Sequence, residues 1–361
     1  MGIPIGNLYY LLSYAWQRLP EADLVDVAHA PETRLADLFA RVLASGVTHV
    51  LKRGLDRAYA TADGEVAGVR GRLDLAASLK RASFARGRAH CAYDELTPDV
   101  LHNRIVRTTL RRLATAAGLH RDNAERMREL YRRMDGVSEL ALTARDFGRI
   151  TLGRNNASYG FLLQVCELVH RHLLVDERSG RATFRDFTRD DREMAWVFEQ
   201  FTANFFAHHA RGRPGYRVWA QRELSWRVGG AADDLRYVPG MRTDVVLQGG
   251  GRTAVVEAKY YAEALAERFG RESVRPGHLY QLFAYLANYP VAPGELLRGV
   301  LLYPRTTRTL GLSFALHGWP VEVWTLDLAQ PWQGVEADLL RIGGFASGDA
   351  PGAATPTARA P

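Results

Sequence analysis

Residues 241–261 read MRTDVVLQGGGRTAVVEAKYY, in which two apolar runs flank a glycine-rich turn. Such runs predict two β-strands that pair as a hairpin. Because strand side chains alternate between faces, Glu257 and Lys259 should point the same way, and pairing would bring Asp244 beside them. The stretch therefore predicts two carboxylates and one ammonium group on one face of an otherwise apolar sheet.

Lys259 is unusual in this chain, because only 3 of its 47 basic residues are lysines. Buried charges are costly unless paired, so these three groups must neutralise one another, bind an ion, or lie at an open edge. The oxygens of Asp244 and Glu257 suit Mg²⁺, which could polarise a phosphodiester. Lys259 could then orient the attacking water or stabilise charge on the phosphate. A surface hairpin closed by a salt bridge is the alternative interpretation.

Two further segments carry polar side chains that could join this group. In LYQLFAYL (279–286), Gln281 and Tyr285 are four residues apart and therefore share one face of a predicted helix. In WVFEQF (196–201), Glu199 lies on an earlier predicted helix, where it is either a further site carboxylate or an ordinary solvated residue.

Taken in order, Glu199, Asp244, Glu257 with Lys259, and Gln281 with Tyr285 resemble the core of the PD-(D/E)xK nucleases and their RecB/Cas4-like branch. Longer strings extend the resemblance, up to about residue 342, to the McrC family of McrBC restriction-system subunits. These strings are IPIGNLYYLLSYAW (3–16), GVRGRLDL (68–75), LHNRIVRTTL (101–110), FRDFTRDDREM (184–194) and LLYPRT (301–306).

This resemblance implies a Mg²⁺-dependent DNA endonuclease subunit. The catalytic residues that it implies are Asp244, Glu257, Lys259, Gln281 and Tyr285, and the implied metal ligands are Asp244, Glu257 and Glu199. Glu257 departs from the best-known member, which has aspartate there, but the superfamily motif accepts either residue.

The resemblance also implies a partner. In the family, an McrB-type AAA+ ring hydrolyses GTP and recognises double-stranded DNA that carries 5-methylcytosine, and the N-terminal region of McrC docks on this ring and stimulates its GTPase. The present chain has no G-x-x-x-x-G-K-[ST] loop, so GTP should be bound by the partner and not by this chain. Arg70, Arg72 and Arg104 could make the activating contact, or they could form salt bridges within the fold.

Two other functions stay open from the sequence: a stand-alone RecB/Cas4-like nuclease of DNA repair, and a non-catalytic activating subunit. The net charge of +7 favours a polyanionic partner in general. No stretch approaches the roughly 18 apolar residues of a membrane span, so no membrane contact is expected. Cys91 and Cys166 form no disulfide framework, which favours the cytoplasm.

The order of predicted elements favours an α/β chain (α+β overall) with two domains. We expect a mixed α/β domain over residues 1–178, and the resemblance implies that this domain docks on and activates the partner. The resemblance implies a PD-(D/E)xK endonuclease domain over residues 185–345, with a central mixed sheet flanked by helices. The polar stretch DERSGRATFRDFTRDD (176–191) marks the boundary, and residues 346–361, which lack core-forming side chains, should be a disordered tail.

Overall fold

The computed structural model of the protein describes residues 3–17, 34–175, 182–230, 232–261, 265–268, 271–305 and 307–345. The chain divides into two compact units. The sheet unit comprises Met1–Ala22 and Phe187–Pro361, and the helical unit comprises Asp23–Asp186. The expected tail, residues 346–361, lies outside the described residues.

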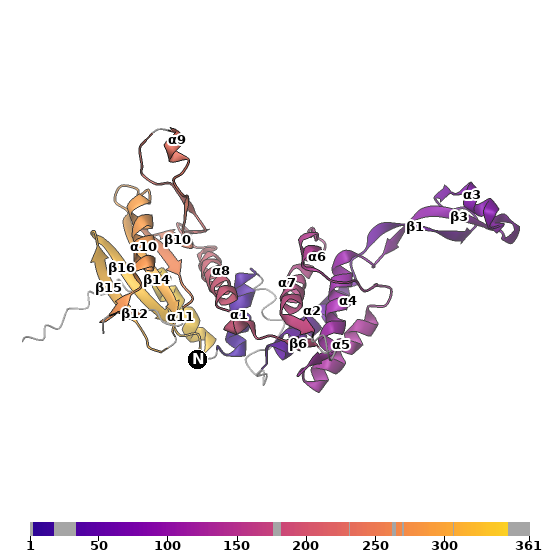
Figure 1. Ribbon diagram of the computed structural model, residues 1–361, viewed down its shortest axis with the longest axis horizontal. Helices are drawn as coiled ribbons and strands as arrows, with labels where there is room; N and C mark the ends of the chain where they lie inside the picture. The colour runs from indigo at the N-terminus through magenta and orange to yellow at the C-terminus, as the bar shows by residue number, and fades with distance from the viewer. Residues whose placement is uncertain are drawn as a thin grey trace, which may run out of the picture. The chain divides into compact units, whose positions relative to one another are not determined.

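A six-stranded mixed sheet forms the centre of the sheet unit, as expected (Figure 1). Its strand order is β15-β16-β14-β11-β10-β7. β14 is parallel to both β11 and β16, and the remaining pairs are antiparallel. The strands are β7 (Arg217–Ala220), β10 (Val245–Gly249), β11 (Arg252–Ala258), β14 (Leu296–Pro304), β15 (Gly311–Leu316) and β16 (Trp319–Leu326).

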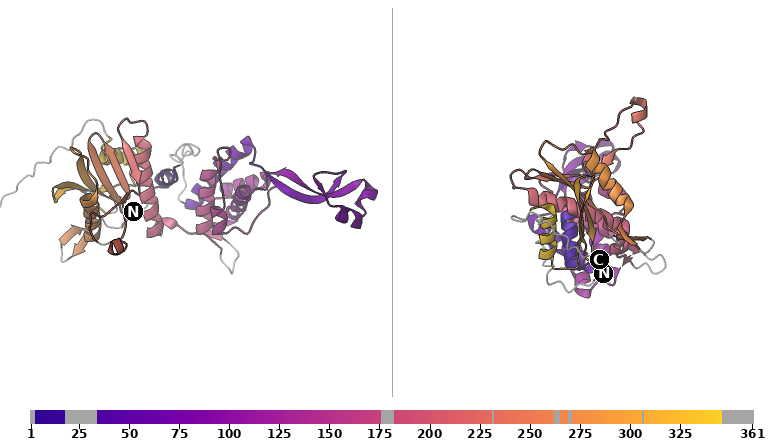
Figure 2. Two further views of the ribbon diagram at one scale, coloured as in Figure 1. Left: turned by 90° about the horizontal axis from the view of Figure 1, so that it is seen from above. Right: turned by 90° about the vertical axis from the view of Figure 1, so that its left-hand side faces the viewer.

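Helices cover both faces of this sheet (Figure 2). The helix α10 (Pro276–Asn288) packs on β14 and β11, α8 (Asp191–Ala210) packs on β7, and α11 (Trp332–Gly343) packs on β16. Gly299 of β14 allows α10 to approach closely, because a Cβ there would lie 2.8 Å from Leu282 Cδ2. The core on the α10 face includes Val246 and Val255, so the strand face that carries them is the one that α10 covers.

The first helix, α1 (Ile5–Ala15), belongs to the sheet unit and packs on α8. The Asn7 side chain donates hydrogen bonds to the carbonyl oxygens of Leu328 and Gln330, at 2.8 and 2.7 Å. The Tyr10 ring stacks on Trp332 with a centroid distance of 4.6 Å. The expectation that residues 1–178 form one domain is therefore wrong at its N-terminal end, because the apolar side of α1 is buried by residues near the other end of the chain.

Short elements complete the sheet unit. They are η3 (Phe187–Arg189), the antiparallel pair β8 (Glu223–Leu224) and β9 (Met241–Arg242), α9 (Ala232–Leu235) between them, and the antiparallel pair β12 (Leu265–Arg268) and β13 (Arg271–Val274). Because β8 follows β7 and β9 precedes β10, the loop that contains α9 leaves and rejoins the sheet at neighbouring strands.

The body of the helical unit is a group of packed helices. They are α2 (Leu35–Arg53), α4 (Leu101–Ala114), α5 (Arg121–Arg133), α6 (Ala144–Gly148) and α7 (Tyr159–His172). A small sheet in the order β4 (Ala116–Ala117), β6 (Ala182–Phe184), β5 (Leu173–Val175) accompanies them. Within the described ranges, no helix of either unit is long and apolar enough to cross a membrane.

An arm, residues 58–97, projects from these helices (Figure 1). Its stem is an antiparallel ribbon of β1 (Ala58–Ala67) and β3 (Arg88–Thr97), which pair over their whole length. Ten paired residues at roughly 3.3 Å per residue make a stem of about 33 Å. The tip holds β2 (Arg72–Leu73), α3 (Leu75–Lys80) and η2 (Ser83–Arg86). Gly71, with φ +67°, lets the chain pass close to the carbonyl oxygen of Ala92.

Candidate active site

The two strands of the opening stretch pair as the sequence predicts. β10 and β11 are antiparallel neighbours, and Val245 lies opposite Val256. This register brings Asp244, which immediately precedes β10, beside the end of β11, where its Oδ2 accepts a hydrogen bond of 2.9 Å from the backbone N–H of Ala258. Beyond β11, the backbone N–H of Lys259 donates to the Leu302 carbonyl of β14 at 2.8 Å, which holds the lysine at the edge of the parallel pair.

Glu257 and Lys259 point the same way, as their spacing predicts. The Lys259 Nζ lies 2.5 Å from Glu257 Oε1, and the Glu257 side chain is completely buried while 20% of the Lys259 side chain is exposed. A salt bridge on an exposed hairpin would leave both groups in water. The burial of Glu257 therefore contradicts the surface interpretation and requires the site to compensate a buried carboxylate.

Both carboxyl groups lie where their charged forms are disfavoured. Burial, and then the charge of Glu257, raises the pKa of Asp244 to about 8. Burial also raises the pKa of Glu257, although Lys259 opposes this effect. Burial alone would lower the pKa of Lys259, but the carboxylates of Glu257 and Asp244 raise it, so the ammonium keeps its charge. The site thus combines one stable cation with two carboxyl groups that lack sufficient positive charge.

Glu199 reaches this pair from α8. Its charge raises the pKa of both Asp244 and Glu257, so Glu199 lies on the side of α8 that faces these two residues. Its Oε1, however, accepts a hydrogen bond of 2.9 Å from the Gln221 side chain. Among the described residues, no three histidine, cysteine, aspartate or glutamate side chains converge on one point as a metal site would require. The structure brings Asp244 and Glu257 together and leaves Glu199 at their margin.

Gln281 and Tyr285 share one face of α10, as predicted, and are joined to each other. The Gln281 Nε2 donates a hydrogen bond of 2.7 Å to the Tyr285 hydroxyl, which in turn donates to the carbonyl oxygen of Arg242, also at 2.7 Å. Arg242 lies two residues before Asp244. The pair therefore fastens α10 to the segment that positions Asp244.

One residue near this group was not predicted from the sequence. His278, in the first turn of α10, forms a hydrogen bond of 2.8 Å between its Nδ1 and the Tyr303 hydroxyl. Its ring packs against Tyr261 at a centroid distance of 4.8 Å. Burial, and then the charges of Lys259 and Arg275, lowers the pKa of His278 to about 4. The available signal was its position three residues before Gln281, which places both on one helix face.

The donor set fits a divalent cation. Both carboxylates supply hard oxygen ligands, and Glu257 Oε2 is buried and has no hydrogen-bond partner among the described residues. An unpartnered buried carboxylate oxygen is costly, and a cation placed between Glu257 and Asp244 would remove that cost. The geometry is therefore that of a site which lacks positive charge, and it can hold Mg²⁺ through these two residues.

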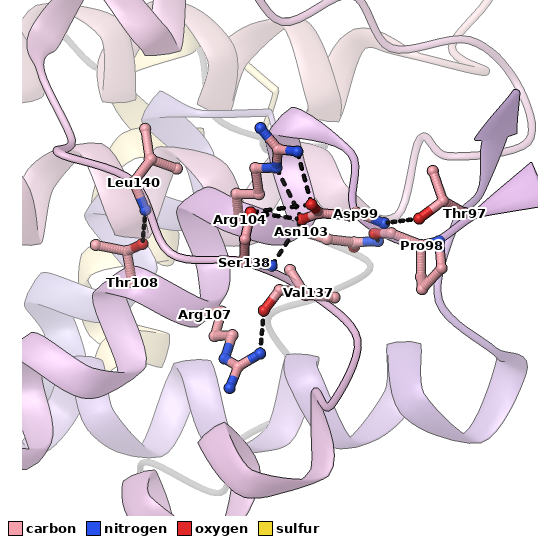
Figure 3. A network of polar contacts seen from close by, with 10 residues as sticks. All are labelled: Thr97, Pro98, Asp99, Asn103, Arg104, Arg107, Thr108, Val137, Ser138 and Leu140. Atoms are coloured by element: carbon pink, nitrogen blue, oxygen red, sulfur yellow. Dashed lines mark hydrogen bonds and ion pairs between the residues drawn. The ribbon is translucent and has the colours of Figure 1, made fainter. Parts of the chain in front are cut away.

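The candidate arginines of the helical unit have different surroundings. Figure 3 shows that Arg104 forms a two-pronged ion pair with Asp99, with Nε–Oδ1 and Nη2–Oδ2 distances of 2.8 and 2.6 Å. Arg104 is thus a structural residue, and its proposed activating role is not supported by its position. Arg70 and Arg72 are exposed at the tip of the arm, where the Arg70 guanidinium lies 4.4 Å from the centre of the Tyr93 ring.

Comparison with known proteins identifies the same family that the sequence motifs resemble. A family model described as "McrBC 5-methylcytosine restriction system component" matches residues 6–304. A curated relative from Escherichia coli strain K12, "Type IV methyl-directed restriction enzyme EcoKMcrBC", is 29% identical over 341 residues, which cover 94% of this chain and 97% of the relative.

A solved structure shares the fold. It is the "refined half-complex from tetradecameric assembly of Thermococcus gammatolerans McrB AAA+ hexamers with bound McrC", with a TM-score of 0.60 and 18% identity, over 95% of this chain and 76% of the other. Since the family match spans most of the sequence, the chain belongs to the family of McrBC 5-methylcytosine restriction system components.

Proposed function

We propose that this chain is the DNA-cleaving subunit of a modification-dependent restriction system and hydrolyses phosphodiester bonds with Mg²⁺. The observation that carries the proposal is the buried group of Asp244, Glu257 and Lys259, in which Glu257 Oε2 has no partner among the described residues. A structural ion pair has no need of a second buried carboxyl group whose pKa is raised to about 8.

Each residue has a distinct task in this proposal. Asp244 and Glu257 hold the cation, which when bound would supply Lewis-acid polarisation of the phosphodiester. Lys259 directs one of its N–H donors to Glu257 and can direct another to the attacking water or to the phosphate, where it offsets developing negative charge. Gln281 and Tyr285 keep the backbone before Asp244 in place, so that the carboxylate does not have to be ordered at the moment of reaction.

We further propose that the chain acts with a GTP-hydrolysing AAA+ partner of the McrB type in the cytoplasm. The similar solved assembly contains McrB AAA+ hexamers with bound McrC, and this chain has no phosphate-binding loop of its own. The arm is the best candidate for the docking element, because its tip exposes apolar side chains beside arginines. These side chains are Val69, Leu75, Leu79 and Phe84. Recognition of 5-methylcytosine in double-stranded DNA is assigned to the partner.

The direct test reconstitutes the chain with its partner, GTP, Mg²⁺ and a plasmid that carries 5-methylcytosine. We expect cleavage only when all components are present, and none from an Asp244→Asn variant that still binds the partner. Asparagine keeps an acceptor for the Ala258 N–H, so the variant should fold. Efficient cleavage by the chain alone would favour a stand-alone nuclease, and full cleavage by the variant would contradict the assigned site.

A further inference from the structure

A histidine lies near Lys259 of the candidate active site, and one of its ring nitrogens is engaged in a hydrogen bond. His278 is on the same face of α10 as Gln281 and Tyr285, and it is close enough to Lys259 for the lysine charge to influence its titration. Its Nδ1 is bonded to the Tyr303 hydroxyl, whereas its Nε2 has no hydrogen-bond partner within the described part of the chain. The ring is half-buried, so a bound molecule can reach it.

The hydrogen bond to Tyr303 determines which ring nitrogen carries the proton. The Tyr303 ring is completely buried in β14, and burial raises the pKa of its hydroxyl, which therefore stays protonated. Among the described residues, His278 is the hydrogen-bond partner of this hydroxyl. The hydroxyl must donate to Nδ1, because otherwise its own proton would be buried without an acceptor. The neutral ring consequently carries its hydrogen on Nε2.

The ring is also held in a fixed plane. The Tyr261 ring packs against it with a centroid distance of 4.8 Å. The Arg275 guanidinium in turn lies 5.0 Å from the centre of the Tyr261 ring. The charged and titratable groups that surround His278 are Lys259 immediately after β11, Arg275 immediately before α10, Tyr261 and Tyr303. Two of these are cations and none is a carboxylate, so the imidazole is kept neutral and acts as a donor at neutral pH.

From this geometry we infer that the Nε2–H of His278 binds a non-bridging oxygen of the phosphate that is cleaved, with Tyr303 as the positioning residue that fixes the tautomer. This inference rests on the proposed nuclease function. A fixed neutral donor near two cations suits an anionic oxygen, and such preorganised donors are effective because they need no rearrangement in the transition state.

Two substitutions separate this role from a structural one. Glutamine places its amide N–H near the position of Nε2, whereas asparagine places its amide near Nδ1 and can keep the bond to Tyr303. Single-turnover cleavage of methylated DNA is measured with the full chain, its partner, GTP and Mg²⁺. We expect His278→Asn to slow cleavage by about 10²-fold with unchanged DNA affinity, and His278→Gln to stay within roughly tenfold of the wild type.

Tyr303→Phe provides a second, independent variant. Removal of the hydroxyl leaves the ring in place but lets both tautomers form, so the rate should fall by roughly 3–10-fold. Because His278 remains neutral, the pH–rate profiles of the wild type and His278→Gln should have the same shape between about pH 6 and 9.

The inference is overturned if His278→Asn cuts at the wild-type rate, if His278→Gln falls as far as His278→Asn, or if Tyr303→Phe has no effect. If His278→Gln lost one of the pH-dependent slopes of the wild-type pH–rate profile, the ring would be assigned proton transfer, and the inference of a neutral donor would also be overturned. A failure of the proposed function is distinguishable, because then the wild type would not cut or Lys259→Ala would cut normally.

Discussion

Two ion pairs of nearly equal length, Lys259–Glu257 in the sheet unit and Arg104–Asp99 in the helical unit, lie in opposite electrostatic surroundings. Their N···O distances are 2.5 and 2.6 Å. Asp99 accepts hydrogen bonds from Nε and Nη2 of Arg104 and from the backbone and hydroxyl of Ser138, and these donors, led by Arg104, lower its pKa to about 2. Glu257 is buried beside Asp244 and has an oxygen without a partner among the described residues.

The comparison teaches that distance does not separate a structural ion pair from a functional one. At Asp99 the fold stabilises the charged form, so the pair contributes to stability. At Asp244 and Glu257 the fold disfavours the charged form, which leaves a deficit of positive charge that a cation can fill. The direction of the carboxyl pKa and the saturation of its oxygens are therefore the informative quantities.

The largest expected contrast concerns cleavage. Lys259→Ala should reduce cleavage of methylated DNA by at least ~10³-fold, because it removes the cation that in the proposed mechanism offsets charge on the reacting phosphate. Lys259→Arg should also fail, because a planar guanidinium does not reproduce the position of the ammonium next to the buried Glu257. Arg104→Ala is the matched control, and it should leave the rate of the assembled complex within about tenfold of the wild type.

These variants are compared in single-turnover assays with partner, GTP and Mg²⁺ present. Circular dichroism and co-purification with the partner check that each variant is folded and docked. Wild-type cleavage rates in both Lys259 variants would contradict the catalytic assignment. An equal loss of cleavage rate in Arg104→Ala would remove the distinction between the two ion pairs.

Local sequence patterns were sufficient to predict most of the site. Alternation and a glycine turn gave the β10–β11 pairing, and helical spacing placed Gln281 and Tyr285 together, because both depend only on near neighbours. The unpartnered oxygen of Glu257 was not predictable, since it depends on how the whole sheet and α10 enclose that side chain. The same holds for His278, whose partner Tyr303 comes from β14 through a parallel pairing.

The division of the chain shows a similar limit. The polar, turn-rich segment 176–191 indicated the boundary near Phe187, because a stretch with few apolar residues contributes little to a core. The placement of α1 could not be read locally, since an apolar helix face does not reveal which distant surface will bury it. The arm could not be read from local patterns either, because its strands β1 and β3 pair across an intervening segment of about 20 residues that includes α3.

The second prediction compares exposed arginines at the arm tip with exposed arginines of α5 in the same unit. The double substitution Arg70→Glu and Arg72→Glu should lower stimulation of the partner's GTPase by at least roughly tenfold, because both side chains are exposed at the arm tip. The same charge change at two exposed arginines of α5, Arg121 and Arg132, is the control and should have little effect. GTP turnover is measured at saturating concentrations of this chain.

Full stimulation by the folded arm variant would place the activating contact elsewhere. Equal losses in the arm variant and the α5 control would show that general surface charge, and not the arm tip, supports the interaction with the partner.

The third prediction is that two matched substitutions, each of aspartate by asparagine, change the free energy of unfolding in opposite directions. Asp99→Asn should destabilise the protein by about 1–3 kcal/mol, because a neutral amide loses the paired interaction with Arg104. Asp244→Asn should stabilise the metal-free protein by about 1–3 kcal/mol, because it removes a buried carboxyl group whose ionisation the fold resists.

Thermal unfolding in EDTA, followed by circular dichroism, measures both effects. Addition of Mg²⁺ should raise the unfolding temperature of the wild type more than that of Asp244→Asn, since the variant retains only one of the two carboxylate ligands. Destabilisation by Asp244→Asn in EDTA would mean that the carboxylate is a structural group like Asp99.

The smallest effect, and the most specific one, is the dependence of these differences on pH. The pKa of Asp99 is about 2 in the folded chain, below the ordinary value near 3.9, so its stabilising contribution is present above about pH 4 and is lost as the pH falls towards 2. The pKa of Asp244 is about 8 in the folded chain, above its ordinary value. The unfolded chain therefore binds fewer protons at Asp244 than the folded chain between about pH 4 and 8, and stability falls as the pH rises through that window.

Each variant should remove one of these slopes, which cannot exceed about 1.4 kcal/mol per pH unit for a single proton. The stability gain of Asp244→Asn in EDTA should thus grow from about pH 4 to 8, and the loss from Asp99→Asn should shrink below about pH 4. Denaturant titrations at several pH values provide the free energies of unfolding. A gain for Asp244→Asn that is independent of pH would show that the benefit comes from packing, and then the electrostatic contrast between the two ion pairs would not explain their different roles.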